Sequence, residues 1–364
     1  MRKINPSNER IKHKYFIFLK DAKQLSEASI DGVAKALARF EDYTQHKDFK
    51  TFRHEQASGF KKHLANTTKS TEAKPLSKAT LRTTYANLKT FFQWLAREPG
   101  YKSKIDYSDA EYFNTSLKDL QIATAKRIQK VPTLEQIKHV INTMPMRTPI
   151  EHRNKALIAF TVLTGSRDSA IASAKLGHIN LAENCFYQDA REVKTKFSKT
   201  FPTYFFPVGN EIKQLFVDWV NYLKTDALYA DSDPLFPMND IALNASLKFD
   251  CVGLKPAHWS TANPIREIFK SAFKNAGLEY FNPHSFRNTL VKLGQETCKS
   301  AEHFKAWSQN LGHEQVLTTF MSYGNIEQNR QAEIIKTLST QSKPPTVVHN
   351  NDKLAQIAAI LQID

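Results

Sequence analysis

The chain has 364 residues, 41% hydrophobic and 24% charged, a composition that argues against wholesale disorder. Its 51 Lys and Arg against 36 Asp and Glu give a net charge of +15, which favours a polyanionic partner such as DNA or RNA. Three cysteines without a CxxC pair argue against a disulfide framework or a thiolate zinc site, and no apolar run predicts a secretion signal or a membrane span.

The positive charge is concentrated in the first part of the chain. Residues 1–130 hold 26 basic and 14 acidic residues, a net of +12, whereas residues 131–364 hold 25 and 22, a net of +3. The length suggests two domains of roughly 150 residues each. We therefore expect a basic module that grips a nucleic acid, joined to a nearly neutral domain; a basic surface that only keeps the protein soluble is the alternative.

The first 125 residues have the apolar periodicity of a helical domain. Helices are expected at 9–19, at 30–40 after a cap at Ser26 or Ser29, at 51–64, and from Ser77 to the Pro99-Gly100 pair. The helix after Ser77 has an apolar stripe on one face and cations on the other. Such a face either lies along a DNA groove or is simply solvated. The DNA contacts that we expect in this domain are Lys35, Arg39, Lys78, Arg82 and Lys89.

A polar stretch at 126–133 is expected to be an exposed linker, after which a second domain begins. Thr133 predicts a helix cap, and further helices are expected over 154–163, from a cap at Thr261 to Gly277, and from near Ser285 past Leu293. Residues 184–208 alternate and predict a β-hairpin with a lysine-rich centre. The chain is thus expected to be mostly α with a small antiparallel hairpin (α+β), with a second domain at 134–339. A tail at 340–364 follows, with a short amphipathic helix over 352–361.

Several residues of the second domain suit phosphoryl transfer, which without a metal needs a nucleophile, cations for the developing charge and an acid for the leaving oxygen. Arg167 follows a helix that ends at Thr164-Gly165, and His284 and Arg287 are three residues apart, so they share one side of a helix. The hairpin centre offers Lys194, Lys196 and Lys199. His313 follows Gly312, and Tyr323 comes ten residues later. Each motif alone is weak evidence.

In this order, the motifs resemble the tyrosine recombinase (phage integrase) family over nearly the whole chain. The most specific stretch is PHSFRNTL together with WSQNLGHEQVLTTFMSYG. The resemblance implies a helical core-binding, SAM-like domain at 1–125 and a catalytic domain at 134–339. It also implies a site-specific recombinase or integrase of a mobile element, cytoplasmic and nucleoid-associated. Such a protein acts as a dimer on a site and as a tetramer in the synapse, on double-stranded DNA with inverted repeats.

The resemblance also implies a role for each site residue. Tyr323 is the nucleophile that forms a 3′-phosphotyrosine, Arg167 and Arg287 hold the non-bridging oxygens, and His284 holds the phosphate or acts as a base. His313 positions the phosphate or the tyrosine. Lys194 protonates the leaving 5′-oxygen, with Lys196 and Lys199 as rivals for that role. Energy is stored in the covalent bond, so neither ATP nor a metal or other cofactor is expected. The tail contacts a neighbouring protomer or packs on its own.

Three features depart from the family pattern. Ala170 stands where the family usually has an acid three residues after the first Arg, and the nearest acid is Asp168. His178 stands where an Asp is usual. The interval from His313 to Tyr323 is about one residue longer than the family's. These departures concern the support of the site and leave the chemistry implied by the resemblance unchanged.

Other functions remain open at this point. A type IB topoisomerase shares the chemistry but relaxes DNA without site specificity, and a family member without catalysis would only bind DNA. An RNA-binding protein is disfavoured because the sequence has no RRM or KH signature.

Overall fold

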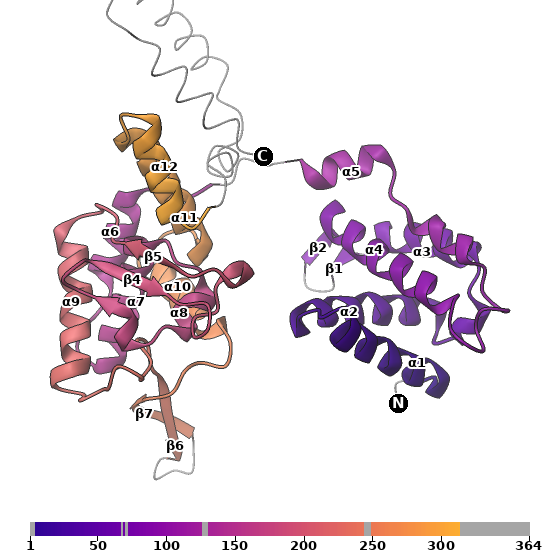
Figure 1. Cartoon of the computed structure of the whole chain (residues 1–364), viewed down its shortest axis with the longest axis horizontal. Helices are drawn as coiled ribbons and strands as arrows, with labels where there is room; N and C mark the ends of the chain where they lie inside the picture. The colour runs from indigo at the N-terminus through magenta and orange to yellow at the C-terminus, as the bar shows by residue number, and fades with distance from the viewer. Residues whose placement is uncertain (1–3, 67, 70–71, 126–129, 244–248, 314–364) are drawn as a thin grey trace, which may run out of the picture. The chain divides into compact units, whose positions relative to one another are not determined.

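The computed structural model describes residues 4–125, apart from 67 and 70–71, and residues 130–313, apart from 244–248. The chain divides into two compact units between Arg127 and Ile128, which lies within the stretch expected as a linker (Figure 1). Both units are predominantly helical with small antiparallel sheets. The expected fold class, mostly α with a small antiparallel β-structure, is confirmed. The described residues include no helix that combines the length and apolar composition needed to cross a bilayer.

The first unit is a helical assembly with one small antiparallel sheet between its third and fourth helices. In chain order the described elements are α1 (Pro6–Ile17), the π-helical turn η1 (Phe18–Ala22), α2 (Glu27–Thr44), the 3₁₀ turn η2 (Phe49–Thr51), α3 (His54–Asn66), β1 (Thr68–Lys69), β2 (Glu72–Pro75), α4 (Lys78–Leu95), the 3₁₀ turn η3 (Tyr107–Phe113) and α5 (Leu117–Thr124).

Two helices of this unit, α2 and α4, begin at the polar caps that the sequence predicts. The Ser26 side chain accepts from the amide of Ser29, which decides between the two expected caps of α2, and Ser77 caps α4. The expected end of α4 at Pro99-Gly100 is wrong. The helix ends at Leu95, because the chain continues in tight turns before it reaches the proline.

The core of the first unit is built from aromatic rings. Phe52 and Phe92 stack with their centroids 3.7 Å apart. Phe40 contacts both of these rings, and also Phe60, edge to face. Phe113, from η3, lies nearly parallel to both rings, with centroid distances of 5.8 Å to Phe52 and 5.9 Å to Phe92. Large rings from four separate elements therefore fix how these elements pack, which positions the exposed faces of α2 and α4.

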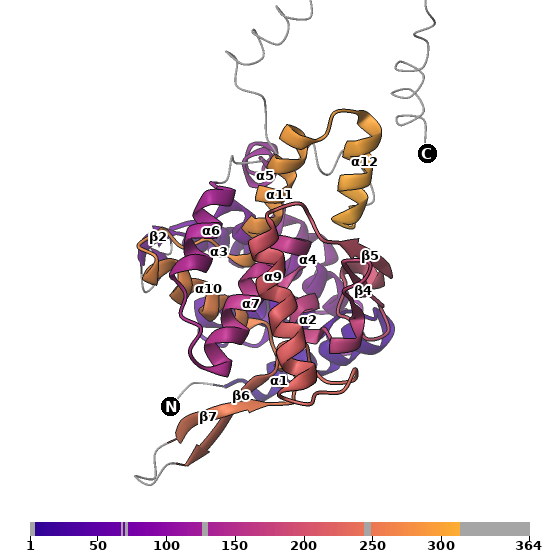
Figure 2. The same cartoon turned by 90° about the vertical axis from the view of Figure 1, so that its left-hand side faces the viewer.

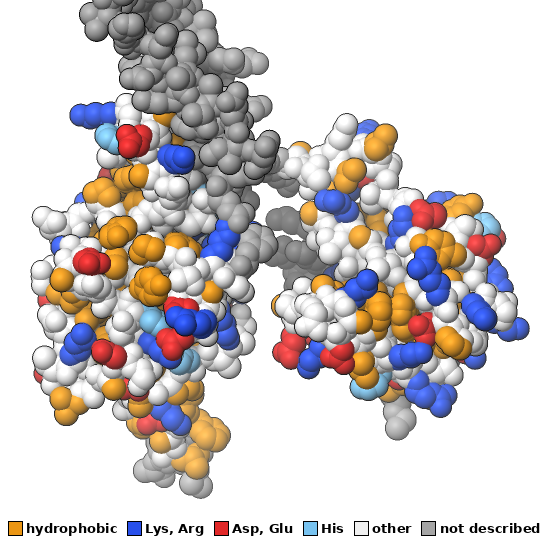
Figure 3. All heavy atoms as spheres, in the orientation of Figure 1, with side chains coloured by type: hydrophobic (Ala, Val, Ile, Leu, Met, Phe, Trp, Pro, Cys, Tyr) orange, Lys and Arg blue, Asp and Glu red, His pale blue; other side chains and the backbone are white. Residues whose placement is uncertain are grey.

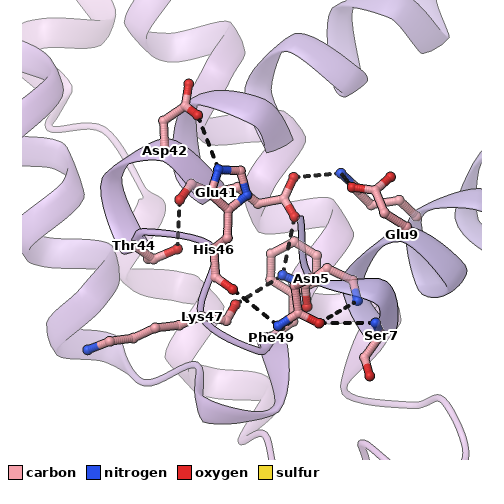
Figure 4. A network of polar contacts seen from close by, with 11 residues as sticks. Asn5, Ser7, Glu9, Glu41, Asp42, Thr44, His46, Lys47 and Phe49 are labelled. Carbon is pink, nitrogen blue, oxygen red and sulfur yellow. Dashed lines mark hydrogen bonds and ion pairs between the residues drawn. The ribbon is translucent and has the colours of Figure 1, made fainter. Parts of the chain in front are cut away.

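A buried polar network joins α1 to the end of α2 (Figure 4). Glu41 is only 2% exposed, and its carboxylate accepts from Lys12 Nζ at 2.6 Å and from the Asn8 amide at 3.2 Å. The Asn8 side-chain oxygen accepts in turn from the amide of Phe49 at 3.0 Å. Burial lowers the pKa of Lys12, but the hydrogen bonds and charges of Glu41 and Glu9 outweigh it, so the pKa is raised. The network thus holds a charged pair inside the unit.

The second unit consists of helices around a central helix, with a three-stranded sheet and a separate two-stranded hairpin. Its described elements are α6 (Leu134–Thr143), α7 (Pro149–Thr164), α8 (Asp168–Ser173), the 3₁₀ turn η4 (Leu176–His178), β3 (Ile179–Asn180), β4 (Cys185–Gln188), the 3₁₀ turn η5 (Lys196–Ser198), β5 (Phe201–Tyr204), α9 (Asn210–Thr225), β6 (Met238–Leu243), β7 (Phe249–Lys255), α10 (Asn263–Asn275), α11 (Pro283–Thr297) and α12 (Ala301–Asn310).

The central helix is α7, whose residues 156–164 are all buried. It packs against α9, and the two helices lie side by side in Figure 2. It begins at Pro149 after a capping box made by Thr148 and Glu151, earlier than the expected start at Asn154. The capping box at Thr133 is confirmed at the start of α6. Because the C-terminal half of α7 is buried on all sides, the end of this helix can act as a fixed point for the residues that follow it.

The predicted hairpin at 184–208 is confirmed in its topology. Strands β4 and β5 pair antiparallel, with Cys185 opposite Tyr204, but residues 189–200 between them form a long loop rather than a tight turn. Strand β3 adds to the outer edge of β4. We call residues 189–200 the lysine loop, because they contain Lys194, Lys196 and Lys199.

The predicted cap at Thr261 is wrong. Helix α10 begins at Asn263 with Ala262 at its N-cap, and the Thr261 hydroxyl only accepts from the amide of Asn263 at 3.4 Å. Pro264, whose fixed backbone angle suits a first helical turn, moves the helix start beyond Thr261. Gly277, with φ +70°, follows the end of this helix as predicted.

The hairpin of β6 and β7 has no counterpart among the predicted elements. Its base is fixed by Arg153 of α7, which is 2% exposed and donates to the Pro237 carbonyl and to the Asn239 side chain, both at 2.7 Å. Burial lowers the pKa of Arg153 to about 10. Further out, the hairpin exposes Ile241, Leu243, Phe249 and Val252, and apolar side chains are visible on it in Figure 3.

Candidate active site

The ends of four elements of the second unit meet at one place. Helix α7 ends at Thr164, and Gly165 takes a left-handed conformation with φ +59°. A Cβ on Gly165 would lie 2.8 Å from methyl groups of Leu290 in α11 and of Leu311 after α12. Both the backbone angle and the close packing therefore require glycine here. The turn leads directly to Arg167, the N-cap residue of α8.

Arg287, in the second turn of α11, ties these elements together. Its guanidinium donates from Nη1 to the Gly165 carbonyl at 2.9 Å, from Nη2 to the Leu311 carbonyl, and from Nε to His313 Nε2 at 3.2 Å. The residue is only 5% exposed. Burial and the charge of Arg167 lower the pKa of Arg287 to about 9. Three of its five N–H groups have these partners, and one on each terminal nitrogen is left for a ligand.

His313 reaches Arg287 because of the way α12 ends. Gly312 is left-handed, with φ +68°, and the His313 amide bonds back to the Ser308 carbonyl at 3.1 Å. The Gly312 Cα lies against the ring of Phe201, so a side chain at this position would collide with it. Burial, followed by the charges of Arg287 and Arg167, lowers the pKa of His313 to about 3. The imidazole is therefore neutral, and because Nε2 accepts from Arg287, its proton is on Nδ1.

His284 and Arg167 complete the group. His284 lies in the first turn of α11, and its pKa is lowered by partial burial and by the charges of Arg287 and Arg167. Arg167 is half-buried and makes no hydrogen bond or ion pair with any described residue. The neighbouring acid, Asp168, pairs instead with Arg266 of α10 at 2.7 Å. Two arginines and two neutral histidines gathered at one place form a site suited to an anion.

The lysine loop is attached to the helix that begins at Arg167. The Lys194 amide donates to Ser173 Oγ at 2.8 Å, and Ser169 Oγ donates to the Lys194 carbonyl at 3.2 Å; both serines are in α8. The Lys194 side chain is exposed, and its ammonium has no partner among the described residues. The charge of Lys196 contributes to the lowered pKa of both His284 and His313, which puts that lysine within electrostatic reach of them. Lys199 accepts through its carbonyl from Thr195 at 2.8 Å.

Position 178 and position 170 show how the site's support differs from the family pattern. His178 is buried, accepts from the Lys175 amide at 3.1 Å and contacts Glu192 of the lysine loop at 2.8 Å. A carboxylate is therefore still present beside position 178, supplied by Glu192. Ala170 is buried in the apolar core, and its methyl side chain cannot provide the acid that the family usually has at this position.

The cations expected to contact DNA in the first unit fall into two groups. Lys78 and Lys89 are paired, to Asp119 at 2.8 Å and to Glu111 at 2.6 Å. Lys35 of α2 and Arg82 of α4 are exposed, and the described residues offer their side chains no partner.

Arg39 of α2 donates to Thr84 of α4 at 3.1 Å and so joins the two helices. The neighbouring faces of α2 and α4 therefore form the better candidate for a phosphate-binding surface. In Figure 3, basic side chains of this unit are interspersed with acidic ones, so net charge alone does not locate that surface.

Four residues that shape the site carry no recognisable sequence motif. Ser169, Ser173 and Glu192 hold the lysine loop, and Arg266 neutralises Asp168, but none belongs to a motif that marks it. Tyr323, the expected nucleophile, lies outside the described residues, as does the expected tail at 340–364. The described residues contain no cluster of three or more His, Cys, Asp or Glu side chains that could hold a metal ion.

Comparisons with known proteins agree in the fold that they indicate. A model of the phage integrase family matches residues 130–330, and a model of the phage integrase N-terminal SAM-like domain matches residues 13–99. A comparison with curated protein sequences gave no match.

Among solved structures, a lambda integrase (75–356) dimer bound to a COC′ core site is 10% identical, with 94% of this chain and 99% of that chain covered and a TM-score of 0.60. XerH recombinase bound to a palindromic difH substrate is 17% identical, with coverages of 90% and 85% and a TM-score of 0.60. The Tn1549 transposon integrase in complex with transposon right end DNA is 12% identical, with coverages of 91% and 98% and a TM-score of 0.55. At these identities the likeness is one of fold.

Proposed function

The chain belongs to the phage integrase family, and from that premise we propose that it is a site-specific DNA recombinase. It cuts and rejoins DNA through a covalent 3′-phosphotyrosine on Tyr323, without ATP or a metal ion. The observation that carries the proposal is the anion site formed by Arg167, Arg287, His284 and His313. The part played by Tyr323 rests on its position in the sequence motif alone.

The anion site matches the charge that develops in phosphoryl transfer. Among the described residues, the Arg167 guanidinium has no hydrogen-bond partner, and Arg287 keeps one N–H on each terminal nitrogen. Together they can hold the non-bridging oxygens of the scissile phosphate. At least one of the two guanidinium groups can bind the phosphate through two parallel hydrogen bonds. Because Arg287 is fixed by three bonds to the protein, it is preorganised and need not reorient as the charge grows.

The histidines are neutral at physiological pH, so they can exchange protons. In the cleavage step, the Tyr323 hydroxyl oxygen forms a bond to phosphorus while the bond from phosphorus to the 5′-oxygen breaks. His284 accepts the tyrosine proton, and its lowered pKa keeps it unprotonated and available for this role. His313, whose Nε2 accepts from Arg287, positions the phosphate or the tyrosine. Rejoining is the reverse of the same step.

A lysine of the lysine loop supplies the proton to the leaving 5′-oxygen. We assign this role first to Lys194, because its main chain is bound to the helix that begins at Arg167 and its ammonium has no partner among the described residues. Lys196 is the rival, favoured by the effect of its charge on His284 and His313.

The working assembly that we propose is a dimer on each DNA site and a tetramer when two sites are joined. The lambda integrase relative was solved as a dimer on its core site, and the Tn1549 and XerH relatives were solved with their DNA. By the same reasoning we propose short inverted repeats as the target, a mobile element as the setting, and the cytoplasmic nucleoid as the place of action.

The decisive experiment is covalent trapping on a nicked suicide substrate, read on denaturing gels. Wild type and the control variant Tyr187→Phe, in which an exposed tyrosine of β4 is changed, are expected to give a protein–DNA adduct. Tyr323→Phe is expected to give none. An adduct of normal yield with Tyr323→Phe would refute Tyr323 as the nucleophile.

Two further assays separate the alternatives. Relaxation of supercoiled plasmid that carries no repeats would indicate a topoisomerase-like activity rather than site-specific recombination. Sequence-specific DNA binding by wild type without any adduct would indicate a family member that only binds DNA.

A further inference from the structure

Helix α8 and the lysine loop are joined at one residue by two hydrogen bonds. Ser169 and Ser173 are four residues apart, so their hydroxyls lie on the same face of α8. Ser173 Oγ donates to the Ser169 carbonyl at 3.0 Å, which leaves its lone pairs to accept from the Lys194 amide at 2.8 Å. Ser169 Oγ donates to the Lys194 carbonyl at 3.2 Å. Both polar groups of the Lys194 main chain are thus held by the helix that Arg167 begins.

Lys194 is the point at which the loop leaves the body of the unit. The preceding residue, Val193, is buried in the core, and Glu192 is held by His178 at 2.8 Å. After Lys194 the chain enters η5 (Lys196–Ser198), in which Lys196 is exposed. The two serines therefore determine where the Cα of Lys194 lies relative to Arg167, whereas the lysine ammonium has no partner among the described residues.

We propose that Ser173 is a positioning residue for proton transfer to the leaving 5′-oxygen. It fixes the main chain of Lys194 at a set distance from the phosphate-binding Arg167, so that the lysine ammonium reaches the oxygen that departs. Ser169 assists through the Lys194 carbonyl. The inference rests on the proposed function, since it concerns the acid of that reaction.

The test uses a leaving group that needs no proton. In a DNA substrate with sulfur in place of the bridging 5′-oxygen at the scissile phosphate, the departing thiolate is stable, because thiols are far more acidic than alcohols. A variant that fails only in proton delivery is slow on the oxygen substrate and normal on the sulfur substrate. A variant with a damaged fold or phosphate site is slow on both.

Single-turnover cleavage by the full chain is compared on the two substrates. Ser173→Ala is expected to be about fivefold to tenfold slower than wild type on oxygen, the effect of one lost hydrogen bond that leaves an amide without an acceptor. On sulfur it is expected to match wild type. Ser173→Thr, which keeps the hydroxyl, is expected to recover most of the oxygen rate. Lys194→Ala and Lys196→Ala are measured in parallel to identify the acid itself.

Each result decides between named possibilities. Equal slowing of Ser173→Ala on both substrates, or no slowing on either, overturns the positioning role. Rescue of Lys194→Ala by sulfur with an unaffected Ser173→Ala refutes the inference and leaves the proposed function standing. If neither lysine variant is rescued, Lys194 does not supply the proton and the inference fails, while the adduct assay on Tyr323→Phe still tests the nucleophile separately.

Discussion

The Nε of Arg287 lies 3.2 Å from Nε2 of His313 and donates to it. An arginine can only donate, so this contact is compatible with a neutral imidazole and incompatible with an imidazolium. The same contact brings a permanent positive charge next to the ring, which is the second cause, after burial, of its lowered pKa. Structure and electrostatics therefore assign the same protonation state to His313.

This state predicts how stability depends on pH. The unfolded chain binds a proton at His313 below pH 6.5, whereas the folded chain does so only near pH 3. The stabilisation from this group is therefore complete above pH 6.5 and is lost as the pH falls towards 3, by at most about 1.4 kcal/mol per pH unit. Urea unfolding of His313→Gln at pH 7, 6 and 5 should show a weaker pH dependence than wild type. His284 is present in both proteins, so its own contribution cancels; parallel pH curves would contradict the prediction.

The two arginines should differ in what they contribute to stability. Arg287→Ala removes the donors to the Gly165 and Leu311 carbonyls, and we expect it to lower the free energy of unfolding by about 2–4 kcal/mol. Arg167→Ala breaks no hydrogen bond among the described residues and should cost under about 0.5 kcal/mol. Both variants should lose covalent adduct formation. Thermal unfolding measures the difference, and equal melting temperatures would argue against the bridging role of Arg287.

The cations of α4 should differ in their effect on DNA affinity. Arg82→Ala removes an exposed charge that has no partner among the residues the structure describes, so the slope of log affinity against log salt should fall by about 0.9. Lys89→Ala removes an ammonium already paired with Glu111, and the slope should change by less than half of that. Fluorescence anisotropy across a salt series provides the measurement. A larger change for Lys89→Ala would place the DNA on another face of the helix.

The buried carboxylate of Glu41 should contribute strongly to the stability of the first unit. Glu41→Ala leaves the Asn8 amide and Lys12 without their acceptor, and we expect a loss of about 2–3 kcal/mol in unfolding free energy. The matched control is Glu9→Ala, because Glu9 also binds Lys12 but is exposed, and its loss should cost under about 1 kcal/mol. Circular dichroism during urea unfolding distinguishes the two, and similar losses would show that burial of Glu41 adds nothing.

Local signals in the sequence predict much of this fold. Polar caps at Ser26, Ser77 and Thr133 begin their helices because each cap depends only on residues within one turn. The motif residues meet for a related reason: Arg167, His284 and His313 each lie at or beside a helix end, where the signals for helix starts and stops are strongest.

Features that depend on distant partners were not predicted. The β6–β7 hairpin is held at its base by Arg153, which is far away in sequence, and its exposed apolar residues give no clear alternation of buried and exposed positions. Thr261 does not cap α10, because Pro264 in the first turn places the helix start at Asn263. The bonds from Ser169 and Ser173 to Lys194 span more than twenty residues and have no local signature.

The hydrogen bonds of Arg287 to the Gly165 and Leu311 carbonyls also change how relatives of this chain can be interpreted. A side chain that closes the junction of α7, α11 and α12 contributes to folding whether or not the protein still cuts DNA. A lineage that has abandoned catalysis would therefore be expected to retain an arginine at this position long after it has lost the one equivalent to Arg167. Retention of Arg167, which the fold does not require, is the better marker of a surviving enzyme.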